Sequence, residues 1–428
     1  MGTIFLYLLL LLIFFSIFFR PWITVVAYYT FVLMNAQHIW FWVFGDLPTS
    51  KILTIFILLA LIVSTIRGKV NFKRLLHLQN RLVFSLWLII HLANFFAPID
   101  EIIVASIPVS VVLSTLNSLV IVYFASQLLI TTKHQLQWMF YAILGTGLYF
   151  TYWSNKVYLT GEMWAYSFNG RLGGPFGSIY QDENSLALIF VVSMPFMIFY
   201  ALSRKSLIQK LLFSLPVPLL WHSIFLTGSR GGLLAMLVTI LISLKFAQSK
   251  KLTVFVLIAV SVALIHQGGA ILNRSQNTIE KAENGGDEPI DPRILSWGAG
   301  LDMLQDYPLL GVGTERFLSA YPQYRDGKIH TTHNTFFQIA ANNGVFAGAI
   351  YLYLFYLSFK FHKKIRAEDK SEDYKMINDA SMSALVGFFI TSMFLDLMTF
   401  EIFYFLLFIN IAKYHLLAEQ VDNDSLKK

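Results

Sequence analysis

The sequence predicts an all-α, polytopic membrane protein, a bundle of roughly 12 to 13 helices that cross a lipid bilayer. Of its 428 residues, 56% are hydrophobic and 13% are charged, and the apolar residues collect in runs. A helical run of about 20 apolar residues can cross a hydrocarbon core of ~30 Å. The runs lack the alternation of apolar and polar residues found in the strands of a membrane barrel, so helices are the expected elements.

Thirteen apolar runs are candidate membrane spans. They centre on residues 3–19, 22–44, 51–66, 82–98, 106–130, 137–153, 185–202, 209–227, 231–246, 252–267, 344–361, 380–396 and 400–416. The first run has neither the basic start nor the cleavage site of a signal peptide, so we expect it to remain as a span. The second run contains Asn35, Gln37 and His38, which also suit a re-entrant segment, and the total is therefore about 12 or 13 spans.

The basic residues predict how the bundle is oriented. Between the spans, lysine and arginine cluster at 67–81, 204–210, 245–251 and 360–366. By the positive-inside rule these loops are cytoplasmic, and the outer face then receives the segments 154–184, 228–231, 269–342 and 396–401. The net charge of +7 is therefore largely an orientation signal, and no basic stripe remains to bind nucleic acid.

The same pattern divides the chain into three parts. Residues 1–268 are expected to form N-terminal membrane helices with an outer loop at about 154–184, residues 269–342 a large outer-face loop with a helical domain, and residues 343–428 C-terminal membrane helices and a cytoplasmic tail. The chain contains no cysteine, which excludes disulfides, iron–sulfur clusters and thiol catalysis.

The large outer loop contains a predicted amphipathic helix and ends beside a histidine. Apolar residues recur at helical spacing between Arg293 and Gln305, after a start at Asp291-Pro292, so this segment can lie along the membrane surface. At the end of the loop, we expect Thr331 or Thr332 to cap the helix that carries His333 into the next span.

His333 is the candidate general base. A histidine can accept a proton from a sugar hydroxyl near neutral pH. The residues alone also fit an interfacial histidine bonded to a backbone carbonyl, which is the commoner case. His330 and His333 have the spacing of two metal ligands on a helix, but no third ligand accompanies them in the loop, so we predict no metal site.

Six arginines fall on the predicted outer face: Arg171, Arg230, Arg274, Arg293, Arg316 and Arg325. Arg230 is the most unusual, because it occupies a tight turn between two apolar spans, where a charge is costly without a partner. One guanidinium group can bind two phosphate oxygens at once, so two or three of these arginines could hold a lipid diphosphate. The alternative is that they extend toward lipid headgroups.

A glycine-rich outer segment, 170–177, precedes two acidic residues, Asp182 and Glu183. It lacks the lysine and the strand-to-helix context of a phosphate-binding loop. Together with Asp396 and Glu401, these acids could supply a catalytic acid or a divalent-ion site, but solvated loop carboxylates explain them equally well. We therefore favour metal-free chemistry.

Three stretches share one order along the chain and one face of the membrane. They are Ser229-Arg230-Gly231; Arg293 and Trp297, leading to Asp306 and the connector YPLLGVG at 307–313; and His333-Asn334, with Gly344 ten residues after Asn334. Together they resemble the O-antigen ligase and polymerase superfamily of bacterial membrane glycosyltransferases, over about residues 168–360. The His-Asn pair with its glycine is the most specific of the three.

Two further segments are similar to a narrower branch, the O-glycosylation ligases found alongside exosortases. They are Arg20-Pro21-Trp22 with the polar stretch 35–38, and residues 174–178 with Asn184. Two positions depart from the superfamily pattern. The superfamily often has a second glycine three residues after the first, where this chain has Ala347 and then Gly348. Asn342 stands where the superfamily often has glutamate, which puts an acidic role at that position in doubt.

The resemblance implies a GT-C-like fold in the bacterial inner membrane and a glycan donor carried on undecaprenyl diphosphate. It implies that Arg230 and Arg293 bind the diphosphate and that His333 deprotonates an acceptor hydroxyl on a protein, a lipid or a glycan. Asn334 would orient His333 or a sugar hydroxyl, and Arg171 would be a secondary contact. The reaction would occur on the periplasmic face, need no metal or cofactor, and invert the anomeric carbon.

Two other functions compete with this one. A polysaccharide polymerase would use the same donor but a lipid-linked glycan as the acceptor. A transporter would explain the many spans and intramembrane polar residues such as His91 and Asn94, but it predicts paired repeats with broken helices near the midplane, and the sequence shows no convincing internal repeat.

Overall fold

The computed structural model describes residues 2–102, 107–167, 170–250, 254, 256, 292–369 and 371–425. Within these residues the regular structure is helical, apart from one isolated bridge between Tyr166 and Leu172. Eight helical segments among the described residues are long and apolar enough to cross a membrane, when Leu207–Thr227 is counted as one segment. The predicted class, a multi-pass helical membrane protein, is therefore confirmed.

The helices follow one another with short connections through most of the chain. The first half contains α1 (Gly2–Phe19), α2 (Trp22–Met34), α3 (Ala36–Ile39), α4 (Phe41–Phe44), α5 (Thr49–Ile66), α6 (Leu78–Phe95), α7 (Val109–Leu129), α8 (Lys133–Thr160) and α9 (Glu183–Leu202). The second half contains α10 (Leu207–Ser214), α11 (Pro216–Thr227), α12 (Arg230–Ala247), α14 (Pro292–Asp306), α15 (Phe317–Ala320), α16 (Thr335–Asn343), α17 (Val345–Glu368), α18 (Glu372–Ser392) and α19 (Glu401–Ser425).

Two predicted spans are not continuous helices. The run at 22–44 breaks after α2, because Asn35 adopts a left-handed conformation with φ of 52°, and the short α3 and α4 follow. The run at 209–227 is divided into α10 and α11 at Pro216, which has no backbone N–H to donate to the preceding turn. The predicted span at 252–267 lies almost entirely outside the described residues.

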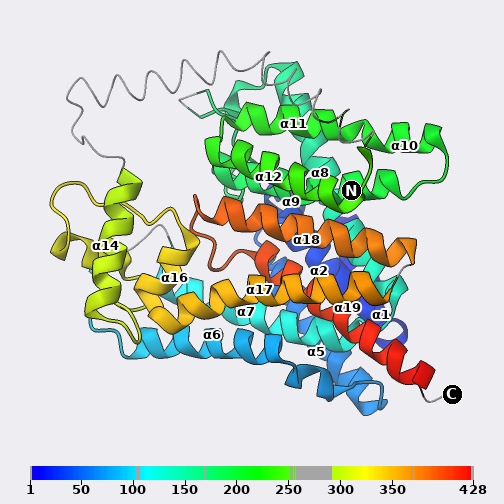
Figure 1. Cartoon of the computed structure of the whole chain (residues 1–428), viewed down its shortest axis with the longest axis horizontal. Coiled ribbons are helices and arrows are strands. Elements are labelled where there is room, and N and C mark those ends of the chain that lie inside the picture. Colours follow the sequence, from blue (N-terminus) through cyan, green and yellow to red (C-terminus); the bar gives the residue numbers. More distant parts are fainter. Residues whose placement is uncertain are drawn as a thin grey trace.

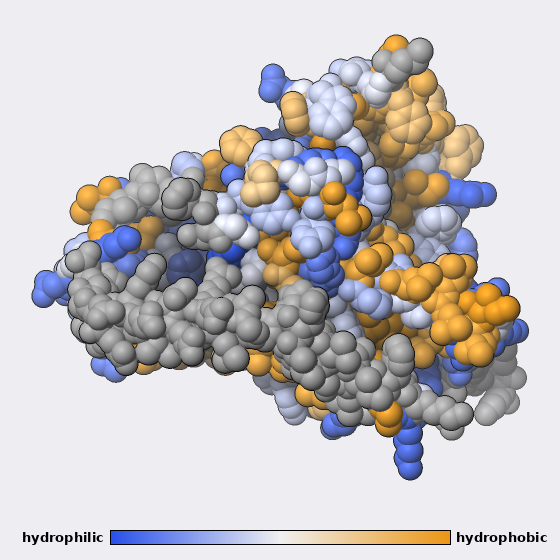
Figure 2. Space-filling model, turned by 90° about the horizontal axis from the view of Figure 1, so that it is seen from above, coloured by the Kyte–Doolittle hydropathy of each residue, from blue (hydrophilic) through white to orange (hydrophobic). Residues whose placement is uncertain are grey.

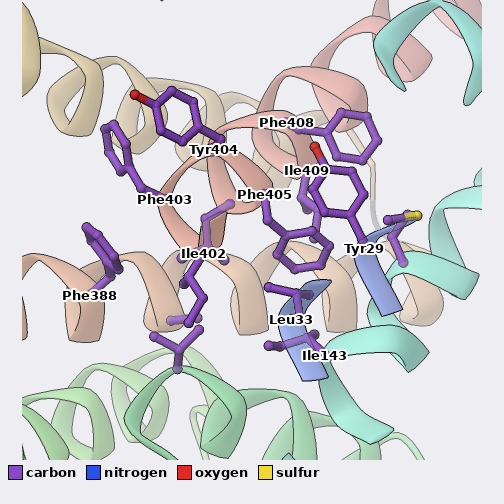
Figure 3. Packing of buried hydrophobic residues seen from close by; sticks show 14 of the residues in the cluster. Tyr29, Leu33, Ile143, Phe388, Ile402, Phe403, Tyr404, Phe405, Phe408 and Ile409 are labelled. Atoms are coloured by element: carbon purple, nitrogen blue, oxygen red, sulfur yellow. The ribbon is translucent and has the colours of Figure 1, made fainter. Parts of the chain in front are cut away.

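The core of the bundle surrounds α9 and α19, which are buried along most of their length, as a helix that is apolar on every side should be. Figure 3 shows side chains from α2, α8, α18 and α19 meeting in this core. The Tyr29 ring stacks on Phe408 with centroids 5.6 Å apart, and Phe388 stacks on Phe403 at 5.5 Å. Such aromatic pairs stabilise the packing beyond the area that they bury.

The outside of the bundle carries many exposed large hydrophobic side chains, as expected of a surface in contact with lipid. Examples are Leu12 on α1, Ile62 on α5, and Ile208 and Leu211 on α10, all more than half exposed. Figure 2 shows such hydrophobic areas on the face seen from above, mostly toward the end away from α14.

Helices α14, α15 and α16 form a small unit at one end of the bundle (Figure 1). Ala299, Met303, Val312, Phe317 and Ala341 belong to its core, which is separate from that of the bundle. Two hydrogen bonds fasten the unit to the end of α6. The Thr314 hydroxyl donates to the carbonyl oxygen of Ile90 at 2.7 Å, and Arg316 donates to Asn94 at 3.0 Å.

Candidate active site at one end of the bundle

Asp396 organises the segment that contains His333. It lies in the loop between α18 and α19, and its carboxylate accepts hydrogen bonds from three consecutive residues of a distant part of the chain. The backbone N–H groups of His333 and Asn334 donate to it at 3.3 and 3.1 Å, and the Thr332 hydroxyl donates to it as well. One carboxylate thus fixes the backbone on both sides of His333.

His333 precedes α16 and does not belong to it. Its φ of 43° is left-handed, which is uncommon for a residue other than glycine, and its side chain is exposed. Asn334 is the helix cap, because its Oδ1 accepts from the N–H groups of Phe336 at 3.0 Å and Phe337 at 3.3 Å. The prediction that Thr331 or Thr332 caps this helix is wrong.

The connector at 307–313 and the end of α16 form one hydrogen-bonded unit. Val312 N–H donates to the Ala341 carbonyl at 2.9 Å, and Val345 N–H donates to the Pro308 carbonyl at 2.8 Å. Gly344 has a φ of 89°, and a Cβ there would overlap the Leu309 carbonyl. This close approach explains why the connector and a glycine at position 344 occur together.

The predicted helix at 293–305 is confirmed as α14 and packs directly against α16. The indole N–H of Trp297 donates to the Thr332 carbonyl at 3.0 Å, and the Trp297 ring stacks on Phe337 with centroids 5.9 Å apart. At the start of α14, the Arg293 guanidinium lies 5.9 Å from the centre of the Phe394 ring. Since Phe394 is two residues before Asp396, Arg293 and His333 adjoin the same loop.

Arg230 approaches this loop from another helix. Gly228, with φ of 57°, ends α11, and the Ser229 hydroxyl accepts from Gly232 N–H at 3.0 Å to begin α12. Gly231 faces Phe394 so closely that a Cβ there would be 2.9 Å from the ring. Arg230 is exposed, and within the described parts of the chain its guanidinium has no hydrogen-bond or ion-pair partner.

The structure therefore brings together three of the predicted site residues. Arg230, Arg293 and His333 come from three separate segments, and each segment adjoins the loop that contains Phe394 and Asp396. Asn334 is adjacent, but its side-chain oxygen is used to cap α16.

Arg171 has a different position. Its guanidinium donates to the Thr227 carbonyl and to Asn184, each at 2.9 Å, and lies 3.6 Å from the Glu183 carboxylate. Leu172 N–H also donates to the Leu226 carbonyl at 2.9 Å. Arg171 thus fastens the glycine-rich segment to the end of α11, just before the turn that presents Arg230.

The other residues that the sequence predicts on the outer face have structural partners or fall outside the described chain. Arg316 binds Asn94, as described above, and Arg325 forms an ion pair with Asp302 at 2.8 Å. Asp182 caps α9 by accepting from Ser185 N–H at 2.9 Å. Arg274 lies outside the described residues. Within the described residues, no group of three His, Asp or Glu side chains is arranged to bind a metal ion.

Sequence reasoning missed two acidic contributions to this site. From the sequence, Asp396 is only one loop acid among four, because nothing in the sequence pairs it with His333. Glu315 is not among the candidates that the sequence indicates. It follows the connector in a left-handed conformation with φ of 57°, and its Oε1 accepts from Gln338 at 3.2 Å. No sequence motif marks it.

Asn342, where the superfamily often has glutamate, has a structural task here. Its side-chain oxygen accepts from Phe317 N–H at 2.9 Å, and its amide group donates to the Gln338 carbonyl at 2.7 Å. An amide supplies both the acceptor and the donor that these two backbone groups need. Asparagine in place of the usual glutamate therefore joins α16 to α15.

Part of the chain matches a known family. A search of curated proteins finds no match. Residues 215–352 match the family model described as O-antigen ligase. The matched segment includes Arg230, Arg293 and His333, together with the connector and Gly344. Over this segment, which is about a third of the chain, the protein is similar to the O-antigen ligase family.

Proposed function

We propose that the protein is a glycosyltransferase of the bacterial inner membrane that works at the periplasmic face. It transfers a glycan from undecaprenyl diphosphate to an acceptor hydroxyl. The observation that carries this proposal is the meeting of Arg230, Arg293 and His333 around the loop of Phe394 and Asp396. Two cations and one proton acceptor are the groups that this transfer needs.

The two arginines bind the diphosphate of the donor. Guanidinium groups pair bidentately with phosphate oxygens, and their fixed charge stabilises the negative charge that develops as the carrier leaves. Arg230 has an exposed guanidinium at the start of a helix, where the helix dipole also favours an anion. In this mechanism the arginines supply the charge neutralisation, so we expect transfer without a metal ion or cofactor.

His333 accepts the proton of the acceptor hydroxyl. The acceptor oxygen then forms a bond to the anomeric carbon, while the bond from that carbon to the diphosphate oxygen breaks and undecaprenyl diphosphate leaves. Direct displacement inverts the anomeric configuration. Asp396, which holds the backbone of His333 and Asn334, stabilises the positive charge of the protonated imidazole.

Arg171 and Asn334 position these groups. Arg171 holds the turn before Arg230, and Asn334 fixes the start of α16 directly after His333. The sequence predicts that both contact the substrate or His333. We assign them a supporting role, because their side chains bind the protein backbone and neighbouring side chains.

We favour a ligase that modifies a protein over a polymerase. Two segments similar to the exosortase-associated ligases lie close together, because a Cβ at Gly177 would lie 3.1 Å from the His38 ring. Beside them, the Tyr180 hydroxyl donates to the Leu33 carbonyl at 2.7 Å. A polymerase would add the glycan to a second lipid-linked glycan, so the identity of the product distinguishes the two.

The test uses purified protein in lipid nanodiscs. Lipid-linked glycan and unmodified acceptor are extracted from cells that lack the gene, since both should accumulate there. His333→Ala should abolish transfer without changing the thermal unfolding temperature. His330→Ala is the matched control, because that histidine packs near Tyr321 with ring centroids 6.3 Å apart. Full transfer by His333→Ala would remove the proposed base.

The arginines are tested through the donor. Arg230→Ala and Arg293→Ala should raise the donor concentration needed for half-maximal rate, whereas Arg325→Ala, which breaks the ion pair with Asp302, should not. An unchanged donor dependence would argue against diphosphate binding. Loss of wild-type activity on addition of a chelator would contradict a metal-free reaction.

A further inference from the structure

Glu315 is held in a conformation that its residue type disfavours. Among the described residues, four other than glycine have a positive φ: Asn35, Gln248, Glu315 and His333. Asn35 and Gln248 end helices, where a left-handed residue is common. Glu315 and His333 instead lie beside α16 at the candidate site. Strained residues persist where the surrounding structure fixes them, often at functional positions.

A hydrogen-bonded chain links Glu315 to the loop of Asp396. Gln338 donates to Oε1 of Glu315 at 3.2 Å, and the side-chain oxygen of Gln338 accepts from Met398 N–H at 3.2 Å. Gln338 follows Asn334 by one helical turn, and Asn334 N–H donates to Asp396. The two carboxyl groups therefore adjoin the same face of α16.

One carboxylate oxygen of Glu315 is open. Within the described residues Oε2 has no hydrogen-bond partner, and the side chain is partly exposed. The neighbouring Arg316 does not pair with it, because that guanidinium donates to Asn94 and to the Thr314 carbonyl. Glu315 is thus a carboxyl group without a cation, which is unfavourable in a partly buried site.

The surroundings make this carboxyl group harder to ionise. Burial first, and then the charge of Asp396, raise the pKa of Glu315 to about 7, while the hydrogen bond from Gln338 acts in the opposite direction. Perturbed carboxyl groups of this kind are often found where a ligand binds.

Charge divides the site into two sides. The arginines Arg230 and Arg293 adjoin Phe394, and the acids Asp396 and Glu315 adjoin α16. A diphosphate is attracted to the first side and repelled from the second. The acidic side therefore suits an uncharged ligand that donates hydrogen bonds, as the hydroxyl groups of an acceptor do.

We propose that Glu315 is an acceptor-binding residue, whose open carboxylate oxygen accepts a hydrogen bond from a hydroxyl group of the acceptor and holds the acceptor beside His333. This proposal rests on the proposed function, because it assumes a transfer in which His333 is the base. It assigns the acceptor to the α16 side of the loop and the donor to the Phe394 side.

The experiment compares Glu315→Gln with the wild type in the nanodisc assay, with lipid-linked glycan and acceptor from cells that lack the gene. Glutamine keeps an oxygen that can accept from Gln338 but removes the negative charge. The matched control is Glu368→Gln, the same change at an exposed acid near the end of α17. Glu315→Gly is a second variant, because glycine suits the backbone at φ of 57°.

Both Glu315 variants should raise the acceptor concentration for half-maximal rate about tenfold or more, the effect of losing a hydrogen bond to a charged group. The donor concentration for half-maximal rate should stay within about twofold, and the unfolding temperature should identify any variant that folds poorly. An acceptor dependence equal to that of the wild type in both variants would overturn the proposal, as would a parallel rise for donor and acceptor.

The His333→Ala variant in the same assay separates the two proposals. If His333→Ala is inactive and Glu315→Gln binds acceptor normally, only the role of Glu315 is wrong. If the wild type does not consume lipid-linked glycan, or His333→Ala transfers normally, the proposed function fails and the role of Glu315 fails with it. Stimulation by Mg²⁺ that is lost in Glu315→Gln would identify a cation ligand and would also overturn acceptor binding.

Discussion

Asp396→Asn should slow transfer by disturbing the backbone around His333. In the wild type, one oxygen of the carboxylate accepts from His333 N–H at 3.3 Å and the other accepts from Asn334 N–H at 3.1 Å. An asparagine retains one acceptor oxygen and places an NH₂ group where the second was. At least one backbone N–H therefore loses a partner that carried negative charge.

A hydrogen bond to a charged group contributes about 1.5–3 kcal/mol. If that energy holds His333 in its left-handed conformation for the reaction, its loss corresponds to a decrease in kcat of about 10- to 150-fold, at about 1.4 kcal/mol for each factor of ten. The donor concentration for half-maximal rate should change little, because Arg230 and Arg293 are untouched.

The assay is the initial rate of undecaprenyl diphosphate release in nanodiscs at saturating donor and acceptor. Asp46→Asn is the matched control, because Asp46 is an exposed acid in the connection between α4 and α5. A kcat for Asp396→Asn equal to that of the wild type would refute the idea that this carboxylate positions His333. So would an equal loss in Asp46→Asn.

Three further predictions concern glycine packing, the Arg171 contacts and pH. Gly344→Ala should lower the unfolding temperature far more than Gly327→Ala. Both glycines have φ near 90°, but of these two positions only Gly344 has other atoms within 4 Å of an added Cβ. Equal decreases in thermal melts would contradict the packing argument. Arg171→Ala should weaken donor use, as seen in initial rates at limiting donor, because the turn before Arg230 loses its fastening; a rate unchanged at limiting donor would count against that role. The pKa of Glu315 is raised from 4.5 to about 7, so the folded state favours the neutral form, and wild-type stability should fall relative to Glu315→Gln as pH rises from about 4.5 to about 7. Melting curves that keep a constant difference across this range would show that Glu315 does not titrate there.

Hydropathy predicted most of the fold, because a membrane span is a local property of about 20 residues. The helix at 293–305 was also predictable, since its apolar residues repeat with the helical period and the helix is observed as Pro292–Asp306. The break at Asn35 was harder to place. Polar residues suggested an irregular segment, but the left-handed turn that ends α2 depends on a single backbone conformation.

The site was predictable only in part. Arg230, Arg293 and His333 stood out through residue type, turn context and resemblance. Asp396 did not, because it is 63 residues from His333 in sequence and its partners are backbone N–H groups, which any residue provides. The cap of α16 could not be predicted for a similar reason, because Thr332 and Asn334 are both good capping residues. In the structure the Thr332 hydroxyl donates to Asp396, and Asn334 caps the helix.

The central claim is that a glycan leaves a lipid diphosphate for a hydroxyl group with His333 as the base. The most direct measurement is the mass of acceptor and lipid before and after reaction of the wild type and of His333→Ala with a defined undecaprenyl-diphosphate-linked glycan. The account predicts that the acceptor gains the glycan without phosphate, that one undecaprenyl diphosphate appears for each transfer, and that His333→Ala forms neither product. An acceptor that gains phosphate, release of undecaprenyl monophosphate, or normal products from His333→Ala would contradict it.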